Sequence, residues 1–290
     1  MVSEVSVNKM SNKLKITLLV GKTIEGLIIA QTLFKNQNDY FEIIGLLNYS
    51  RQGSKARKGR EVSLTFENKL KILFQAKGIW GTLFYSLVKR WFVSPNSKIR
   101  RILIKILPRN WFNYTDLEEL AQKFNTPLLT TKDINSYQAK NFLNKLKPDL
   151  GIVCLTEIIK DYIFTIPKFG CLNYHNGLLP KYRGSACIFW QLYYKDSIGY
   201  TIHEIDRGID SGSIILKKEI SYKKKDNLAK TIIYLKRKMS KDCAKEIVRI
   251  ISKLKKNGKI ESYSQDEKSV SFFRLPSLEQ KKELEKRFLK

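Results

Sequence analysis

The 290-residue chain has few of the residues from which metal sites and disulfides are built. It holds four cysteines and two histidines, and no two cysteines form a CxxC pair. Structural zinc sites need four Cys or His ligands at short spacings, so this composition argues against a metal centre. Cys154, Cys171, Cys187 and Cys243 are interpreted as reduced, semi-buried apolar residues of a cytoplasmic protein.

Long hydrophobic runs are also absent. Leu14–Val20 and Ile102–Ile104 are far shorter than the roughly 20 apolar residues that a membrane-spanning helix needs. The N-terminus lacks the basic head, apolar stretch and small-residue cleavage site of a secretory signal. The sequence therefore predicts a protein that is not integral to a membrane and that resides in the cytoplasm.

Acidic residues are scarce. The chain has 27 Asp and Glu against 54 Lys and Arg, which gives a formal net charge of +27. A surface of this kind attracts polyanions such as RNA, anionic lipid head groups or phosphorylated substrates. A general bias toward lysine would produce the same charge, so the charge alone identifies no partner. Hydrophobic residues make up 43% of the chain, enough for a sizeable core.

Hydrophobic periodicity predicts an α/β fold with a mostly parallel central sheet. A strand at 14–20, a helix at 23–35 and a strand at 41–47 form the opening of such a fold. Thr115 and Glu118 have the spacing of a helix-capping box. Further strands are expected at 127–130, 149–154, 170–174, 198–205 and 213–220, and further helices at 136–147, 185–194 and 225–256.

Two segments differ from this alternation and suggest the domain limits. Residues 64–112 are rich in aromatic and basic residues at helical spacing, and they are interpreted as a helical insertion packed on its own domain. Contact of the basic aromatic segment 78–112 with an anionic membrane surface is a second interpretation. Residues 223–290 read as a basic helical C-terminal extension that follows a catalytic domain at 13–222. No pattern indicates an oligomeric state.

The segment from residue 170 to 212 carries the chemistry. Asn173 and His175, at positions i and i+2, lie at the end of a predicted strand, and their side chains are on the same face. In open α/β sheets, ligands bind outside the carboxyl ends of the strands. An amide that stabilises an oxyanion and an imidazole that moves protons are what acyl transfer requires.

Asp210 lies between Gly208 and Gly212 in a predicted turn. If its carboxylate reaches His175, it raises the pKa of the imidazole and fixes the orientation of the ring. Taken alone, each of these short motifs is more often structural, since Asp is a common turn residue. No GxSxG nucleophile is present, so direct attack by a substrate group is favoured over a covalent enzyme intermediate.

The same segment resembles the signature of the folate-dependent formyltransferases, which include methionyl-tRNA, glycinamide ribonucleotide and sugar N-formyltransferases. The family reads approximately Gly-x-x-Asn-x-His-x-Ser-Leu-Leu-Pro-x-Tyr-Arg-Gly, then Gly-Val-Thr-x-His and Leu-Asp-x-Gly. The residues of this chain that match are Gly170, Asn173, His175, Leu178, Leu179, Pro180, Tyr182, Arg183, Gly184, Gly199, Thr201, His203, Ile209, Asp210 and Gly212. Weaker similarity extends over about 14–220.

The resemblance implies a Rossmann-like formyltransferase core and a set of roles. Asn173, His175 and Asp210 would be catalytic. The co-substrate would be 10-formyltetrahydrofolate, no metal would be needed, and the folate would contact Leu155, Thr156, Ile158, Asp206 and Asp210. Tyr182, Arg183 and Gly184 would bind the acceptor. His203 matches a frequent family histidine, but its place in a strand favours a structural role.

One departure from the family pattern is Gly177, which stands where the family usually has serine. The preferred acceptor is a small anionic amine, an amino sugar on a nucleotide or lipid phosphate, because the residues after 220 do not read as the tRNA-gripping β-barrel of methionyl-tRNA formyltransferase. That enzyme's reaction on tRNA is the runner-up. Hydrolysis of 10-formyltetrahydrofolate and folate binding without turnover are further alternatives.

Overall fold

The computed structural model describes residues 13–50, 116–154 and 157–288. The predicted insertion at 64–112, with its membrane-contact segment 78–112, lies outside these residues. Among the helices that are described, none combines the length and the apolar character needed to cross a membrane.

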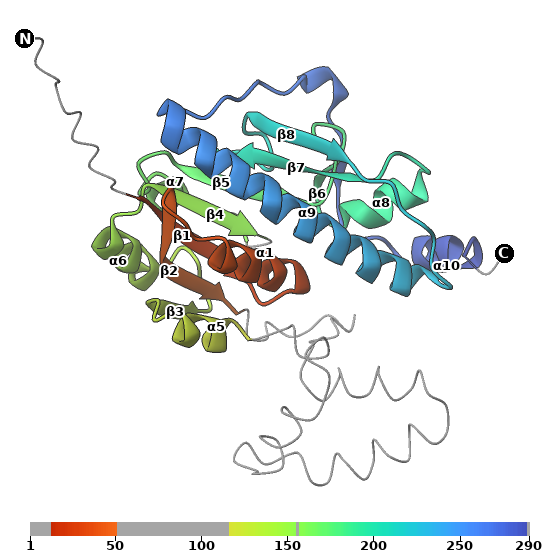
Figure 1. Ribbon diagram of the computed structural model, residues 1–290. Coiled ribbons are helices and arrows are strands. Elements are labelled where there is room, and N and C mark those ends of the chain that lie inside the picture. The colour runs from red at the N-terminus through yellow and green to blue at the C-terminus, as the bar shows by residue number, and fades with distance from the viewer. Residues whose placement is uncertain (1–12, 51–115, 155–156, 289–290) are drawn as a thin grey trace, which may run out of the picture. The chain divides into compact units, whose positions relative to one another are not determined.

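The described residues form a seven-stranded sheet with the order β3-β2-β1-β4-β5-β7-β8 (Figure 1). The strands are β1 (Leu14–Gly21), β2 (Phe41–Tyr49), β3 (Leu128–Thr131), β4 (Leu150–Cys154), β5 (Cys171–His175), β7 (Gly199–Glu204) and β8 (Ile214–Glu219). The first five strands of that order are mutually parallel, and β7 and β8 add to β5 as an antiparallel edge. The predicted α/β class with a mostly parallel sheet is confirmed.

The helices flank this sheet. They are α1 (Ile24–Lys35), α5 (Leu117–Lys123), α6 (Tyr137–Leu146), α7 (Asp161–Phe164), α8 (Cys187–Tyr193), α9 (Leu228–Asn257) and α10 (Leu278–Lys286). Side-chain caps define several starts: the Thr23 hydroxyl accepts from the Gly26 N–H in α1, and the Asn227 side chain accepts from the Lys230 N–H in α9. Helix α9 ends at Gly258, whose left-handed φ of 72° suits glycine.

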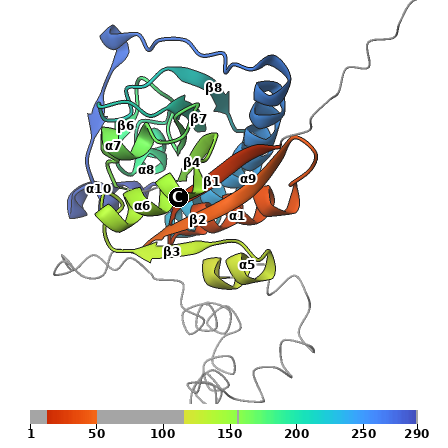
Figure 2. The ribbon, with the colours of Figure 1, turned by 90° about the vertical axis from the view of Figure 1, so that its left-hand side faces the viewer.

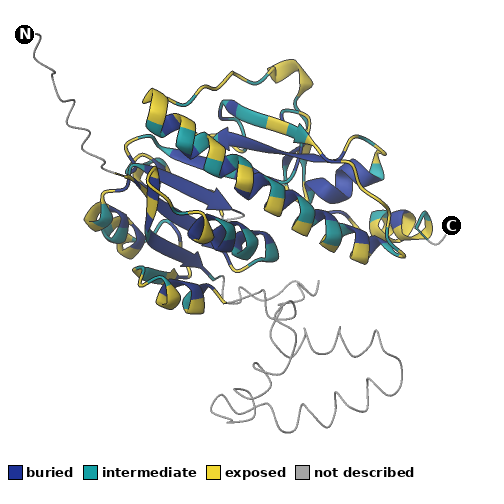
Figure 3. Ribbon diagram, in the orientation of Figure 1, coloured by how far each residue is buried: buried dark blue, intermediate teal, exposed yellow. Residues whose placement is uncertain are grey.

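The two faces of the sheet bury two separate cores. Alternate residues of β1 pack on the face of the sheet that carries α1 and α9; they are Ile16, Leu18 and Val20. Leu19 points the other way, into a cluster with residues of α6 and α7. Figure 2 shows the helices on opposite sides of the strands, and Figure 3 shows that the central strands are buried. β4 is buried along its whole length, which is why the sequence there is a continuous apolar run.

Helix α9 packs on α1 and contributes fully buried side chains to the larger core, among them Leu235, Met239 and Cys243. The described residues on both sides of residue 222 lie in one compact unit. The predicted division into 13–222 and 223–290 stays a prediction.

The predicted capping box at Thr115 and Glu118 is wrong. The N-cap of α5 is Asp116, whose carboxylate accepts from the Leu117 N–H at 2.7 Å. Glu118 instead accepts from the side chain of Asn48 at 3.0 Å. Thr115 itself lies outside the described residues; the carboxylate of Asp116 satisfies a free N–H group at the start of the helix.

After α9 the chain returns across the core. We call residues 259–277 the C-terminal strap. Tyr263 pairs with Ile214 of β8, and β9 (Phe272–Phe273) pairs in parallel with β6 (Arg183–Gly184). The short helix η2 (Glu267–Ser269) lies between these contacts. The strap therefore runs beside the predicted site (Figure 1).

Candidate active site

Strands β5 and β7 set the frame of the site. In their antiparallel register, Asn173 faces His203 and His175 faces Thr201. Side chains of directly opposed residues lie on the same face of a sheet, as do those at i and i+2. All four side chains therefore share one face, at the carboxyl end of β5.

The loop that follows His175 is fastened by Thr201. The Thr201 hydroxyl donates to the carbonyl of Gly177 at 2.8 Å and accepts from the Leu179 N–H at 3.0 Å. Gly177 is required by close packing, since a Cβ at this position would lie 2.7 Å from the Cys187 Cβ and 2.8 Å from the His175 Nε2. A buried loop held this tightly keeps the imidazole in one place.

Asp210 reaches the same site from the loop between β7 and β8. Its Oδ1 lies 3.5 Å from His175 Nδ1 and 3.7 Å from His203 Nε2, and its Oδ2 accepts from the Gly184 N–H at 2.8 Å. The structure thus brings the three predicted catalytic residues together, and it adds His203.

The contacts of His175 fix where its protons lie. Its Nε2 lies 2.5 Å from the Tyr182 carbonyl, which can only accept a hydrogen bond, so this nitrogen carries a proton. Nδ1 faces the Asp210 carboxylate, and a second proton there is favourable. Burial lowers the pKa of His175, but Cys187 and Asp210 raise it by more, and the net pKa is above its ordinary value.

The carboxyl group of Asp210 stays ionised. Burial raises its pKa, but the nearby His175 and the Gly184 N–H lower it by more, and the pKa falls to about 2. The side chain is 16% exposed, so the charge sits in a site that is largely shielded from water. In this setting the imidazolium of His175 and the carboxylate of Asp210 form a pair that can hold a proton.

His203 orients Asn173. The His203 Nδ1 lies 2.7 Å from the carbonyl of Glu204 and donates to it, which leaves Nε2 as the acceptor in the neutral ring. The Asn173 Nδ2 lies 3.1 Å from that Nε2. An amide nitrogen has two N–H groups, so one is directed at His203 and the other has no partner among the described residues.

The predicted acceptor-binding residues are engaged within the protein. Tyr182 is 1% exposed and its hydroxyl donates to Asp196, while Arg183 is 3% exposed and bonds Gln265 and Glu267. The Gly184 N–H donates to Asp210. These contacts favour a positioning role for all three residues, and their contact with an acceptor stays a prediction.

The predicted folate contacts are only partly described. Leu155 and Thr156 lie outside the described residues. Ile158 has 64% of its surface exposed, and Asn135 holds the backbone beside it through the Ile158 carbonyl and the Lys160 N–H. Asp206 accepts from the Gly208 N–H and the Ser211 hydroxyl, so its side chain shapes the loop that carries Asp210.

Two contacts of the site were not predicted from the sequence: His203 lies against the Asn173 amide, and Thr201 holds the loop that follows His175. The register between β5 and β7, which places both opposite the predicted residues, was the missing information. Gln265, which bonds the Asp210 loop from the strap, had no signal in the sequence.

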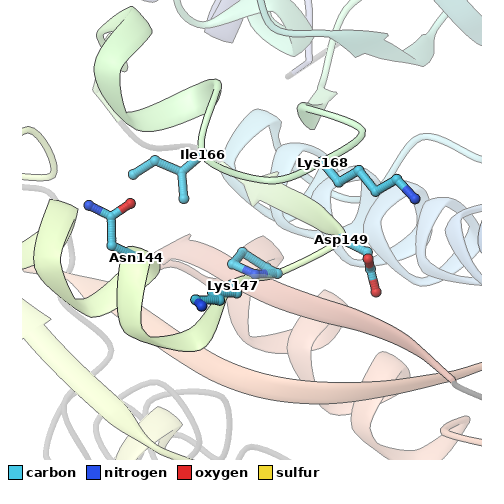
Figure 4. A pocket seen from close by; sticks show the side chains of 6 residues that line it. Asn144, Lys147, Asp149, Ile166 and Lys168 are labelled. Carbon is cyan, nitrogen blue, oxygen red and sulfur yellow. The ribbon is translucent and has the colours of Figure 1, made fainter.

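A cavity of about 430 Å³ lies elsewhere, near the amino end of β4 (Figure 4). Its lining residues are Asn144, Lys147, Pro148, Asp149, Ile166 and Lys168. Asp149 precedes β4, whereas the site lies at the carboxyl ends of the strands, so this cavity contains none of the predicted site residues. In the described part of the chain, no group of three or more His, Cys, Asp or Glu side chains is arranged to hold a metal ion.

The comparisons with known proteins point to formyltransferases. A family model described as formyl transferase matches residues 118–240. This range includes Asn173, His175, His203 and Asp210. The methionyl-tRNA formyltransferase of Kosmotoga olearia is 32% identical over 160 residues, covering 54% of this chain and 50% of the relative. That of Thermodesulfovibrio yellowstonii is 39% identical over 146 residues, covering 49% and 45%. The chain spans about half the length of these curated relatives.

Among solved structures, the chain is similar to the N-formyltransferase from Helicobacter canadensis in complex with folinic acid and dTDP-3-aminofucose. The TM-score is 0.51 and the identity 17%, over 90% of this chain and 70% of the other. At this identity the likeness concerns the fold.

Proposed function

Because the chain belongs to the folate-dependent formyltransferase family, we propose that it transfers a formyl group from 10-formyltetrahydrofolate to a primary amine. The observation that carries this proposal is the contact of His175 Nδ1 with the Asp210 carboxylate, beside the amide of Asn173 and at the carboxyl end of β5. It is an arrangement for stabilising negative charge on oxygen and for moving a proton.

Asn173 is the proposed oxyanion donor. His203 takes one of its N–H groups, and this contact fixes the plane of the amide so that the second N–H keeps a constant direction. A donor that is oriented before the reaction stabilises a developing charge without reorganising. Asn173 is partly exposed, so a bound molecule can reach it.

His175 and Asp210 are the proposed proton-transfer pair. The Nε2 proton is committed to the Tyr182 carbonyl, so the exchangeable proton sits on Nδ1, where Asp210 stabilises it. As an imidazolium, His175 donates this proton to the departing nitrogen, and it can then accept one from the attacking amine. The pKa of His175 is above its ordinary value because Cys187 and Asp210 outweigh the effect of burial, and this favours the protonated ring.

Folate fits the chemistry of the residues that lie near the site. Ile158 offers an exposed apolar side chain in the segment that follows β4, and pterin is a flat ring that packs on such surfaces. Leu155, Thr156, Ile158, Asp206 and Asp210 are the residues proposed to hold it. When bound, the folate supplies an activated formyl group.

For the acceptor, we favour an amino sugar carried on a nucleotide or lipid phosphate. Beyond the matched segment, the described residues of α9, the strap and α10 pack on the catalytic unit itself. This packing supports an acceptor that binds at that unit. The net charge of +27 suits any acceptor with phosphate groups.

A methionyl-tRNA acceptor is the second candidate, favoured by the names of the curated relatives. To separate the two, formylation of methionyl-tRNA and of aminosugar nucleotides such as dTDP-3-aminofucose is measured at 50 and 200 mM salt. Contacts to a polyanion weaken by about 10³–10⁵ over this range when several phosphates are held. Transfer to a sugar nucleotide that changes little with salt supports the preferred acceptor. Fast transfer to tRNA with every sugar inert overturns it.

A further inference from the structure

Gln265 links the C-terminal strap to the loop that carries Asp210. Its Nε2 donates to the carbonyls of Asp210 and Gly212, both at 2.8 Å. Its Oε1 accepts from the Arg183 guanidinium, from Nη2 at 2.9 Å and from Nε at 3.2 Å. One side chain thus joins the loop after β7 to the residue that precedes Gly184.

The chemistry of the partners fixes how the amide points. Carbonyl oxygens only accept hydrogen bonds and a guanidinium only donates them. The NH₂ group of Gln265 must therefore face Asp210 and Gly212, and its oxygen must face Arg183. The reverse orientation would place like groups in contact at every position.

The loop that Gln265 holds has a conformation that needs support. Asp210 has a φ of 51°, in the left-handed region, where residues other than glycine are uncommon. The surrounding contacts must hold it there, and the two carbonyls bonded by Gln265 are those of Asp210 itself and of a residue two positions on.

The strap also positions the Gly184 N–H, which donates a hydrogen bond to the Asp210 carboxylate. Arg183 N–H donates to the Ser271 carbonyl and Ser185 N–H donates to the Phe273 carbonyl. Between these two bonds, the Gly184 N–H donates to the Asp210 carboxylate and not to the strap. A Cβ on Gly184 would lie 2.3 Å from the Phe273 carbonyl oxygen, which shows how closely the two segments approach.

We infer that Gln265 is a positioning residue, which holds the Asp210 carboxylate against His175 by fixing the backbone of its loop. The inference rests on the proposed function for its catalytic consequence, but the placement of Asp210 can be measured without turnover. Gln265 lies outside residues 118–240, so this role belongs to the part of the chain beyond the family match.

The test compares variants in the full chain. Gln265→Met keeps the length of the side chain without its hydrogen bonds and without adding charge, and Gln265→Ala removes the side chain. Ser262→Ala is the matched control, because Ser262 is in the same strap but bonds Glu204, outside the Asp210 loop. We expect kcat to fall by about 10-fold to 10²-fold in both Gln265 variants, since a small misplacement of a catalytic group has this effect. Thermal melts confirm that each variant is folded.

The second readout is the titration of His175 by NMR. The chain has two histidines, so a His203→Gln variant assigns both ring signals. The titratable groups that face His175 are Asp210, Cys187 and His203. Displacement of Asp210 removes one of the two favourable interactions, so we expect the pKa of His175 to fall in both Gln265 variants and to be unchanged in Ser262→Ala.

The outcomes separate the two proposals. A folded Gln265→Met protein with the wild-type pKa of His175 and wild-type kcat overturns the role of Gln265. A lowered pKa in a protein that formylates no amine supports that role and counts against the proposed function. A lowered pKa together with a lowered kcat supports both.

Discussion

Asn173 on β5 lies directly opposite His203 on β7, with the amide Nδ2 3.1 Å from the imidazole Nε2. The second nitrogen of His203 is occupied by the Glu204 carbonyl, so the ring presents a fixed acceptor to the amide. A residue predicted to be structural thus sets the direction of the proposed oxyanion donor.

This relationship predicts the effect of two His203 variants. His203→Phe fills the space but offers no acceptor, so the Asn173 amide can rotate, and we expect kcat to fall by about 10²-fold. His203→Gln places an acceptor near the position of Nε2 and should retain more activity. Steady-state kinetics on both proteins checks this order. Equal activity of the Phe variant and the wild type would mean that the contact does not matter for catalysis.

The ion pair of His175 and Asp210 predicts a window of pH in which it stabilises the fold. The pKa of His175 is raised above 6.5, so its contribution is complete below pH 6.5 and is lost as the pH rises through the folded pKa. The pKa of Asp210 is lowered from 3.8 to about 2, so its contribution is complete above pH 3.8 and is lost as the pH falls toward 2.

Asp210→Asn should therefore destabilise the protein most between about pH 4 and 6.5, by about 2 kcal/mol in the free energy of unfolding. The amide keeps the size of the side chain, so packing changes little. Urea denaturation of both proteins across pH 2–9 measures the difference. A difference that does not vary with pH would show that the charge of Asp210 does not contribute.

The fold class and the shared face of Asn173 and His175 could be predicted from local patterns, whereas the approach of Asp210 to His175 was implied only by the resemblance to the formyltransferases. The apolar run of β4 and the Asn-x-His spacing at the end of β5 can be read without knowing which elements pair. The contacts of His203 and Gln265 depend on pairing across 30 and 55 residues, respectively. The wrong cap at Thr115 had another cause: Asp116 is an equally good capping residue one position later.

Gly177 predicts a clash if the serine usual in the family is introduced. In Gly177→Ser and Gly177→Ala, the new Cβ meets the Cys187 Cβ and the His175 Nε2, at 2.7 and 2.8 Å, so the imidazole or its neighbours must move. We expect a loss of about 1–3 kcal/mol in stability and a lower kcat in both variants. Chemical denaturation and kinetics provide the measurement. A serine variant more active than the wild type would contradict this view of the loop.

The packing of α9 predicts that residues beyond 222 stabilise the whole unit. Leu235 is fully buried in the larger core, so Leu235→Ala should lower the free energy of unfolding by about 2–5 kcal/mol. Ile233 lies on the same helix and is 37% exposed, so Ile233→Ala serves as the control. Its free energy of unfolding is expected to change by no more than about 0.5 kcal/mol. Similar small losses in both variants would indicate that α9 is not part of the core.

The most direct test of the central claim is to follow a ¹³C-labelled formyl group from 10-formyltetrahydrofolate to an acceptor amine by mass spectrometry. The acceptors are aminosugar nucleotides and methionyl-tRNA, and the proteins are the wild type, Asn173→Ala, His175→Ala and Asp210→Ala, each shown to be folded. We predict labelled N-formyl product with the wild type and a rate about 10²–10⁴ lower in each variant. Wild-type rates in all three variants, or no labelled product from any acceptor with the wild type, would contradict the account.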